Sequence, residues 1–422
     1  MQQHLALALI TLLSAALARP GFAGPLEWSQ WRGPQRDGKS TETGLLKEWP
    51  AGGPPLIWKS TELGSGYGSI SASGSRLFTM GDKQAESYVM ALGQTDGKLL
   101  WQTKVGKAGA PGWGGFSGPR CTPTVAGELL LAADQWGDLT CVEAATGKEV
   151  WRKNYEKDFG GKRPEWGYAE SPLVDENRVI VTPGGSEGAI VALNLKTGET
   201  LWRSTKFTDG AQYSSPVVAI IGGVRQYVQL TMESLVGVAA DDGRVLWQAK
   251  RKGSTAVIPD PIISGNRIYV TSGYGTGCNL FKVSGTGSFS VEQEYANKIM
   301  VNHHGGVVLT GDHLYGYSDG KGWTCQNFQT GAAVWADKEK LKKGSIAFAD
   351  GMLYCREEAD KSKTAKGTVA LLEATPTGFK EKGRFDPPDR SDKNSWPHPV
   401  IAGGRLYIRD QEVLLCYDVR AK

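Results

Sequence analysis

The chain has little net charge and few of the features that mark nucleic-acid or membrane proteins. Its 48 Lys and Arg residues nearly balance 44 Asp and Glu residues, which leaves a formal net charge of +4, and the basic residues are scattered. A surface that follows phosphates needs clustered basic residues, so we expect no nucleic-acid partner. Beyond the N-terminus there is no apolar run of the ~20 residues that span a bilayer. Sustained helical periodicity is also missing, so we expect neither a membrane span nor long helices.

The first 23 residues have the pattern of an export signal. An apolar run over residues 5–17 is followed by small residues at Gly21 and Ala23. This pattern predicts cleavage after Ala23, although residues 1–4 contain no Lys or Arg. The run is too short to span a bilayer, and no Cys lies near the cleavage site to carry a lipid anchor. We therefore expect residues 1–23 to be a signal peptide and the mature chain to be soluble, either periplasmic or secreted.

What the chain does contain is a repeat that ends on tryptophan. Residues 139–151, LTCVEAATGKEVW, comprise a short apolar strand, a Thr-Gly-Lys turn and a second strand. Copies of this stretch end at Trp101, Trp202, Trp247 and Trp335, at intervals of about 45–50 residues or twice that length. Each unit contains four short strands, and four strands in a unit of about 40–50 residues are typical of a β-propeller blade.

Counting the units gives eight blades. Residues 56–59, LIWK, have the pattern of a closing strand without its own repeat, and the eighth unit ends before a fourth strand. If this N-terminal strand pairs into the last blade, the ring closes without an open edge. The sequence thus predicts an all-β fold, an eight-bladed β-propeller of four-stranded blades over residues 58–422, closed by an N-terminal strand that completes the last blade and preceded by a Trp-rich extension over residues 24–57.

The recurrent tryptophans are expected to be structural. The turn glycine adopts a positive φ without steric cost. The Trp ring can then pack on the neighbouring blade while its indole N–H finds a carbonyl. We assign this docking role to Trp58, Trp101, Trp151, Trp202, Trp247 and Trp335. The fifth and seventh units lack this Trp, and the aromatic residues that could replace it are Phe289 or Tyr295 and Phe379 or Phe385.

The six cysteines have two interpretations. An even number of Cys in an exported chain is compatible with disulfides. Cys141, Cys325 and Cys416, however, occupy a position that is Ala or Gly in other repeats. Buried Cys serves at such a position as a small hydrophobic residue. The sequence leaves Cys121, Cys278 and Cys355 undecided.

The repeated motif, as in residues 144–151 (AATGKEVW), resembles the tryptophan-docking repeat of pyrroloquinoline quinone (PQQ)-type propellers. That family includes the quinoprotein alcohol dehydrogenases and the BamB-like propellers of outer-membrane barrel assembly. The resemblance covers residues 58–419 and implies the propeller fold, but it is shared by enzymes and scaffolds. The dehydrogenase hallmarks are absent, namely an adjacent Cys-Cys pair, a Cys-x-x-Cys-His haem motif and long insertions. The lipid-anchor cysteine of the assembly lipoprotein is absent as well.

Candidate ligand residues lie in the loops that lead from a closing strand into the next inner strand. In a propeller these loops share one face and converge on the axial channel. Aromatic residues together with Arg, carboxylates and His are the components of a ligand funnel, in which Arg would bind a carboxylate and oxygen ligands would bind Ca²⁺. The alternative is that these residues only line a wet channel. The candidates are Trp113, Phe116, Arg120, Trp166, Tyr168, Glu170, Tyr213, Asp260, His303, His304, Trp396 and His398.

Three local patterns that suggest chemistry have simpler interpretations. His303 and His304 are neighbours in an extended segment, whose side chains point to opposite faces, so we expect at most one to face the channel and no shared metal. Residues 184–188 match Gly-x-Ser-x-Gly, but a nucleophile elbow needs a helix after it, and a strand is expected there. The glycine-rich stretches 64–68 and 273–277 also lack the helix N-terminus of a phosphate site.

Two functions from different classes remain. The first is a monomeric, exported, non-catalytic scaffold that binds a protein or a small-molecule ligand at the loop face, without a metal site or an assured cofactor. The alternative is a PQQ-dependent oxidoreductase similar to the quinoprotein alcohol dehydrogenases, with PQQ and Ca²⁺ in the axial funnel. We favour the scaffold because the repeat is structural in content and the dehydrogenase hallmarks are missing.

Overall fold

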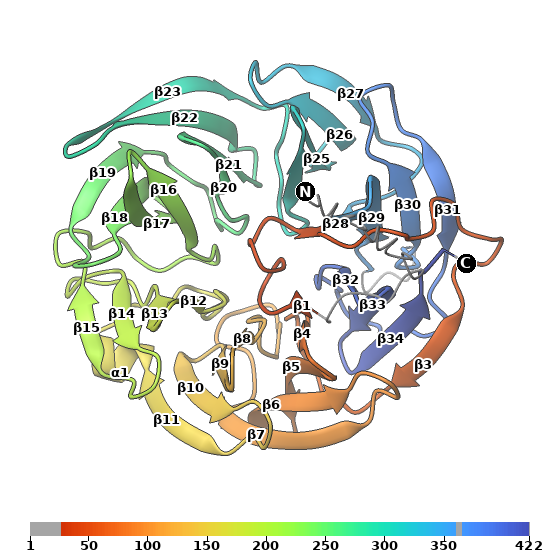
Figure 1. The fold of residues 1–422 in the computed structure, drawn as a ribbon, viewed down its shortest axis with the longest axis horizontal. Helices are drawn as coiled ribbons and strands as arrows, with labels where there is room; N and C mark the ends of the chain where they lie inside the picture. The colour runs from red at the N-terminus through yellow and green to blue at the C-terminus, as the bar shows by residue number, and fades with distance from the viewer. Residues whose placement is uncertain (1–26, 360–364, 422) are drawn as a thin grey trace, which may run out of the picture.

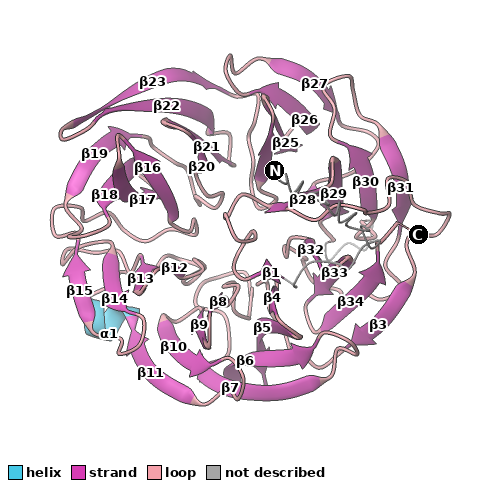
Figure 2. Ribbon diagram, in the orientation of Figure 1, coloured by secondary structure: helices cyan, strands magenta, loops and turns pink. Residues whose placement is uncertain are grey.

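The computed structural model of the chain is a ring of eight antiparallel four-stranded blades around a central axis (Figure 1). It describes residues 27–359 and 365–421, so the predicted signal peptide, residues 1–23, lies outside the described residues. Within them the regular structure is almost entirely strand, with one short helix, α1 (Tyr155–Phe159), as Figure 2 shows. The predicted eight-bladed, all-β propeller is confirmed.

Each blade begins with a strand next to the axis and ends with a strand at the rim (Figure 1). The first four blades comprise β4 (Ser71–Ser73), β5 (Arg76–Lys83), β6 (Glu86–Gly93) and β7 (Leu99–Lys107); β8 (Thr124–Ala126), β9 (Leu129–Ala133), β10 (Asp138–Glu143) and β11 (Glu149–Asn154); β12 (Leu173–Asp175), β13 (Arg178–Val181), β14 (Val191–Asn194) and β15 (Thr200–Arg203); and β16 (Val217–Ile221), β17 (Val224–Leu230), β18 (Ser234–Ala239) and β19 (Val245–Lys250).

The last four blades follow the same order. They comprise β20 (Ile262–Ser264), β21 (Arg267–Ser272), β22 (Gly277–Gly285) and β23 (Phe289–Asn297); β24 (Val307–Thr310), β25 (His313–Ser318), β26 (Gly322–Asn327) and β27 (Ala333–Asp337); β28 (Gly344–Ala349), β29 (Met352–Glu357), β30 (Val369–Glu373) and β31 (Glu381–Phe385); and β32 (Val400–Ala402), β33 (Arg405–Asp410) and β34 (Val413–Asp418) with the N-terminal strand β3 (Leu56–Ser60).

The ring is closed by strand exchange between the two ends of the chain. Strand β3 pairs antiparallel with β34 and becomes the rim strand of the eighth blade, with Trp58 opposite Cys416. The same cross-strand pair recurs as Cys141 opposite Trp151 and as Cys325 opposite Trp335. The closure predicted from the incomplete eighth unit is therefore confirmed, because the N-terminal strand supplies the missing edge.

The repeated tryptophans connect one blade to the next. The indole N–H of Trp151 donates to Leu195 O at 2.9 Å, and that of Trp202 donates to Ala240 O at 3.0 Å. Trp58, Trp101 and Trp335 donate in the same way to Gln94 O, Ala144 O and Thr375 O. Trp247 differs, because its N–H donates to Gln226 Oε1 of its own blade. Each indole thus satisfies a polar group while it buries its ring.

In the two blades that lack the docking Trp, another aromatic residue contacts the next blade. In the fifth blade Tyr295 donates its hydroxyl to Phe328 O at 2.9 Å, and its ring lies against the turn glycine Gly331 of the sixth blade. In the seventh blade the ring of Phe385 lies against Gly53, which precedes the rim strand of the eighth blade. Tyr295 and Phe385 therefore contact the glycine of the following blade in place of the Trp, whereas Phe379 packs edge-on against the docking Trp335 of the sixth blade.

The segment before β3 crosses the axis of the ring instead of lying outside it (Figure 1). Strand β1 (Glu27–Trp28) pairs with β4 of the first blade, and β2 (Lys39–Ser40) pairs in parallel with β28 of the seventh. Between them, the buried guanidinium of Arg36 donates to Ser171 O, Pro172 O and Pro216 O, which lie just before the inner strands of the third and fourth blades. Arg32 likewise donates to Val307 O of the sixth blade at 2.6 Å. The segment thus closes the central channel with hydrogen bonds to several blades.

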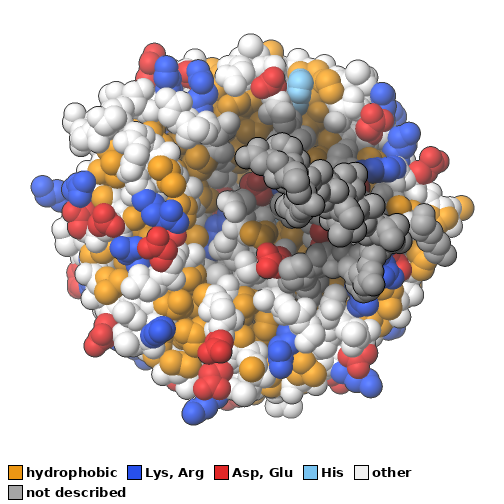
Figure 3. All heavy atoms as spheres, viewed as in Figure 1, with side chains coloured by type: hydrophobic (Ala, Val, Ile, Leu, Met, Phe, Trp, Pro, Cys, Tyr) orange, Lys and Arg blue, Asp and Glu red, His pale blue; other side chains and the backbone are white. Residues whose placement is uncertain are grey.

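The six cysteines are all buried and none forms a disulfide. Cys121, Cys278 and Cys355, which the sequence left undecided, are therefore small core residues like the other three. On the face shown in Figure 3, Lys and Arg side chains are interspersed with Asp and Glu. No helix in the described part of the chain has the length and apolar character needed to cross a membrane.

Candidate functional site

A cavity of about 540 Å³ lies on the axis, above the crossing N-terminal segment. Loops from all around the ring contribute to it because antiparallel blades place two kinds of loop on one face. These are the loops between blades and the loops between the second and third strand of a blade. The lining residues are Trp31, Tyr67, Trp113, Phe116, Arg120, Trp166, Ala169, Ser171, Tyr213, Ser215, Ala256, Ile258, Tyr274, His303, His304, Lys342, Lys343, Glu358, Ala365, Asn394 and Trp396.

The floor of the cavity comes from the N-terminal segment. Trp31 lies between β1 and β2, and its indole N–H donates to Asp260 Oδ2 at 2.6 Å. The other oxygen of Asp260 accepts from Ser215 N at 2.6 Å. Burial raises the pKa of Asp260, although Arg32 and Arg36 oppose that rise. Asp260 is therefore occupied in holding the floor and does not face the cavity.

One wall is a continuous stack of rings. Trp396 is stacked between Tyr67, at 4.3 Å, and His304, at 4.4 Å between ring centroids. His304 is stacked in turn on His303 at 3.6 Å. Both faces of Trp396 and of His304 are thus covered, so only their edges face the cavity. Ring edges carry the positive end of the aromatic quadrupole.

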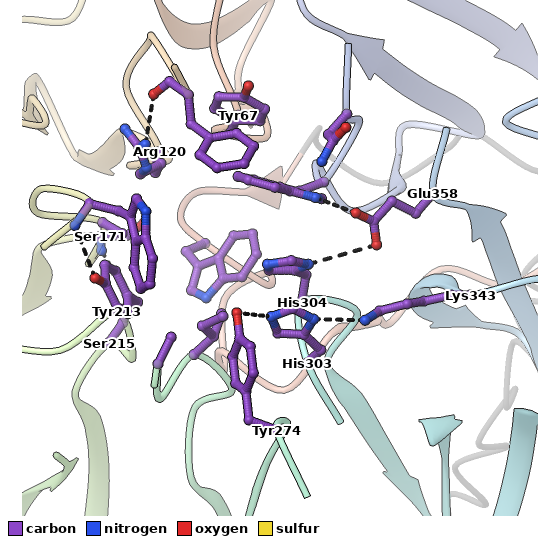
Figure 4. Close-up of a pocket in the computed structure, with 18 of the residues that line it drawn as sticks. Tyr67, Arg120, Ser171, Tyr213, Ser215, Tyr274, His303, His304, Lys343 and Glu358 are labelled. Carbon is purple, nitrogen blue, oxygen red and sulfur yellow. Dashed lines mark hydrogen bonds and ion pairs between the residues drawn. The ribbon is translucent and has the colours of Figure 1, made fainter. Parts of the chain in front are cut away.

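A hydrogen-bonded chain continues this wall at its lower end in Figure 4. Lys343 Nζ lies 2.7 Å from His303 Nδ1, and His303 Nε2 lies 2.7 Å from the hydroxyl oxygen of Tyr274. Burial, with the nearby His304 and Lys343, lowers the pKa of His303 to about 2, so the ring is neutral. Lys343 also pairs with Asp319 at 3.0 Å.

Glu358 is the carboxylate that lines the cavity, and both of its oxygens face groups of the same wall. One accepts from the indole N–H of Trp396, and the other lies 3.7 Å from His304 Nδ1 (Figure 4). Burial alone would raise the pKa of Glu358, but His304, Lys343 and Trp396 outweigh it and lower the pKa. The group is therefore an ionised carboxylate at neutral pH, turned toward its own wall.

The opposite wall carries Arg120 and Tyr213 (Figure 4). Arg120 donates to Gly118 O and Phe116 O, both at 2.8 Å, and burial lowers its pKa. The hydroxyl of Tyr213 accepts from Trp166 N at 3.2 Å, and burial raises its pKa to about 12. Trp113, at the mouth, packs edge-on against Trp166 at 5.5 Å and is 69% exposed.

The sequence candidates divide into two groups. Trp113, Phe116, Arg120, Trp166, Tyr213, His303, His304 and Trp396 line the cavity. Tyr168, Glu170, Asp260 and His398 lie outside it. Tyr168 donates to Pro183 O, Glu170 accepts from Thr182 N, and the His398 ring packs on Trp31 while its Nε2 bonds to His304 O.

The expectation that at most one of His303 and His304 faces the channel is wrong. Both line the cavity and their rings stack. Strand alternation does not apply to them, because they lie in a bend before β24. That the two residues share no metal stays a prediction, which the stacking supports because stacked rings do not direct their nitrogen atoms at one point.

Several lining residues were not singled out from the sequence, and those that make the contacts described above include Trp31, Tyr67, Tyr274, Lys343 and Glu358. Tyr274 and Glu358 lie between the second and third strand of their blades, and those loops share the face with the loops between blades. Lys343 immediately precedes β28, so the loop rule could have found it. Trp31 belongs to a segment without periodicity, whose place the sequence does not indicate.

The lining does not fit a PQQ molecule held with Ca²⁺. Calcium takes six to eight oxygen ligands, several of them carboxylates. In the described ranges no three His, Cys, Asp or Glu side chains gather as a metal site. Glu358 is engaged by Trp396 and His304, while Glu170 and Asp260 bond elsewhere. Arg120 and Lys343 would suit a ligand carboxylate, but the described residues offer the metal no such set of carboxylates.

Comparisons with known proteins place the fold among two groups. BamB of Shewanella oneidensis is 26% identical over 234 residues, 52% of this chain and 57% of that protein. The chain thus spans about half the length of the relatives it matches. The structure of BamB from Moraxella catarrhalis has a TM-score of 0.61 at 14% identity, over 87% of this chain and 98% of that one. The quinohemoprotein alcohol dehydrogenase of Comamonas testosteroni has a TM-score of 0.63 at 12% identity, over 94% and 81%.

The structural likenesses at such low identity show the fold alone. The sequence match is more specific, because a family model described as "Outer membrane protein assembly factor BamB" matches residues 85–337. That span is more than half of the 422 residues. The chain therefore belongs to the family of outer membrane protein assembly factor BamB.

Proposed function

We propose that the chain is a non-catalytic binding propeller that holds its ligand, or one group of a protein partner, in the axial funnel. The observation that carries this is the cavity itself, about 540 Å³ in volume, closed below by Trp31 and walled by aromatic rings from several blades. Preformed concave sites with aromatic walls and a few placed polar groups are typical ligand sites.

The positions and hydrogen-bond partners of the carboxylates near the cavity support a binding role rather than a catalytic one. A general base needs a suitable pKa and access to the substrate. Glu170, whose pKa burial raises to about 7, has the first property but does not line the cavity. Glu358 does line it, but it is turned toward Trp396 and His304.

The family supports a role in the cell envelope. The matching relatives are named as outer membrane protein assembly factors, and the N-terminal apolar run has the pattern of an export signal. We place the chain in the periplasm on this basis, acting as a monomer that binds through its loop face. Localisation with a C-terminal fluorescent or epitope tag, with and without residues 1–23, tests this placement.

The test of binding uses the tryptophans of the funnel. A panel of ring-bearing small molecules (aromatic acids and amides, hexoses, hexuronates) is titrated while intrinsic fluorescence is followed. We expect saturable quenching by at least one class, and loss of it in Trp166→Ala. The matched control is Trp136→Ala, because Trp136 lies between Lys107 and Arg163 outside the cavity. Quenching that persists in Trp166→Ala would contradict a funnel site.

The competing function is a quinoprotein-like dehydrogenase, which the fold alone permits. The purified chain is incubated with PQQ and Ca²⁺, and dye-linked alcohol oxidation is measured. We expect no turnover. Turnover that disappears in Arg120→Ala would overturn the proposal of a non-catalytic site, since Arg120 is the guanidinium that lines the cavity.

A further inference from the structure

We propose that the corner of the funnel formed by Tyr274, His303 and Lys343 is a subsite for the carboxylate of a ring-bearing organic acid. This inference rests on the proposed function, because it names the chemistry that the funnel selects. The three residues come from three different loops and lie together on one side of the cavity (Figure 4).

The direction of the hydrogen bonds follows from the donors available. A lysine ammonium only donates, so His303 Nδ1 accepts from Lys343 Nζ. A neutral imidazole has one N–H, which must then be on Nε2, and it donates to the hydroxyl oxygen of Tyr274. The Tyr274 hydroxyl therefore keeps its own proton for another acceptor. Within the described residues the structure gives it no second partner.

The chain of donors makes Tyr274 a better donor than an isolated phenol. Hydrogen bonds in series polarise one another, and here the series begins at a cation. Burial, with Asp319 and Glu358 nearby, raises the pKa of Tyr274, so its proton stays in place. Lys343 itself has three N–H groups, of which His303 and Asp319 take two.

Tyr274 lies in the tight turn between β21 and β22, in which Thr276 N donates to Gly273 O and both Tyr274 and Gly275 have a positive φ. Its φ is +55°, in the left-handed region that a bulky residue rarely adopts. Such a conformation persists where the surroundings impose it, often at binding sites. Tyr274 is also 43% exposed although it is a large aromatic residue. A tyrosine held in this conformation between Gly273 and Gly275 presents its hydroxyl to the cavity.

The remaining polar groups favour an acceptor over a donor in the ligand. The cavity-lining carboxylate, Glu358, accepts from Trp396 with one oxygen, and its other oxygen lies 3.7 Å from His304 Nδ1. Arg120, Lys342 and Lys343 are cationic, and the stack of Trp396 and His304 presents positive ring edges. Asp319 and Glu358 also lie near Tyr274, but Asp319 is paired with Lys343 and Glu358 is turned toward Trp396, so the donors left for a ligand match a carboxylate. The apolar part of the acid would lie against the wall of Trp166.

Two sources can supply such a carboxylate, an aromatic acid and a sugar acid. Calorimetric titrations at one pH and one salt concentration compare each acid with an uncharged analogue, phenylacetate with phenylacetamide and glucuronate with glucose. We expect one acid to bind at least about tenfold more tightly than its neutral analogue, as a charge-assisted hydrogen bond implies. The pair that shows the preference identifies the source.

The variants separate this corner from the rest of the funnel. Tyr274→Phe keeps the ring and removes the donor, and we expect about a fivefold to tenfold weaker binding of the acid with binding of the neutral analogue unchanged. Lys343→Gln is expected to remove the preference for the acid. The matched control is Tyr88→Phe, because the Tyr88 hydroxyl bonds to Glu86 of the first blade, outside the cavity; it should bind like the wild type.

The possible failures are distinguishable. Equal affinity for acid and neutral analogue, or an unchanged preference in both Tyr274→Phe and Lys343→Gln, would overturn the subsite and leave the funnel as a binding site. An absence of binding by all four probes would overturn the subsite, and the proposed function would fall with it if the wider panel also gave no quenching that depends on Trp166.

Discussion

At the scale of single residues, the buried imidazole of His398, beneath the floor of the funnel, makes the stability of the folded chain depend on pH. Its ring packs on Trp31 at 4.6 Å, its Nε2 bonds to His304 O at 2.9 Å, and its Nδ1 is buried without a partner. Burial, with the nearby Arg32, lowers the pKa of His398 to about 3. Protonation would place a second positive charge beside Arg32 in a buried site.

The lowered pKa of His398 predicts that the folded chain loses stability over one range of acidic pH. An unfolded His has a pKa near 6.5, so between pH 6.5 and 3 the unfolded chain binds more protons than the folded chain. The stability that the folded chain gains from keeping His398 neutral is complete above pH ~6.5 and is lost as the pH falls toward 3. His398→Gln should reduce the loss between pH 7 and 4, by up to about 3 kcal/mol. Urea unfolding at several pH values measures it, and parallel profiles for the two proteins would contradict it.

A second prediction concerns the turn glycine that lies against a docking tryptophan. A Cβ on Gly243 would overlap the ring of Trp202, whereas one on Gly223 would meet nothing within 4 Å. Both residues have a positive φ, +70° and +76°, so both Ala variants carry the backbone strain of about 1 kcal/mol. We expect Gly243→Ala to cost about 1–3 kcal/mol more than Gly223→Ala. Equal unfolding midpoints in urea would refute the docking contact as an element of stability.

At the scale of elements, the N-terminal segment forms the floor of the cavity and also links the blades to one another. Arg36 is fully buried, and its guanidinium serves three carbonyls that lie before the third and fourth blades. Burial lowers its pKa to about 10, although Asp260 and Glu170 oppose the shift, so it remains charged at neutral pH. The segment therefore links blades that are far apart in sequence.

Arg36→Met keeps much of the apolar stem and leaves those carbonyls without donors. We expect a loss of about 2–4 kcal/mol in the free energy of unfolding. The matched control is Arg244→Met, because Arg244 pairs with Asp242 at the surface and such pairs contribute little. Chemical denaturation of both variants measures the difference. Similar losses in the free energy of unfolding would contradict the claim that Arg36 links the blades.

The elements that the sequence predicted are those that repeat. The strands, the turn glycines and the docking tryptophans recur at a fixed spacing, and the missing rim strand of the eighth unit pointed to Trp58. The crossing segment could not be predicted in this way. Arg36 contacts carbonyls more than a hundred residues away, and nothing in the composition around Trp31 indicates that it lies on the axis.

The candidate site also contains residues that the sequence could predict and residues that it could not. Trp113, Arg120, Trp166 and His304 were expected to lie in one cavity from their place in the loops between blades, and they do. Tyr274 was missed, because the glycines around it were considered only as a phosphate loop. Its loop joins the second and third strand of a blade, and it faces the cavity because antiparallel strands return to the same side.

At the scale of the whole molecule, stability comes from ring closure and core packing rather than from cross-links. All six cysteines are free and buried, and burial raises the pKa of Cys121 and of Cys141 to about 12, so both stay as thiols. We expect the melting temperature to be the same with and without a reductant, and Ellman's reagent to react with six thiols only after unfolding. A reductant-dependent melting temperature would indicate disulfides that this fold does not contain.

The central claim is that the aromatic funnel is the binding site of the molecule. Trp113 and Ile220 offer a direct test, because both are exposed, 69% and 62%, and only Trp113 lines the cavity. The measurement is a calorimetric titration of the tightest-binding probe into the wild type, Trp113→Ala and Ile220→Ala. We predict at least about fivefold weaker binding for Trp113→Ala, as loss of an aromatic contact of about 1 kcal/mol implies, and unchanged binding for Ile220→Ala. Equal affinity in all three proteins would contradict the claim.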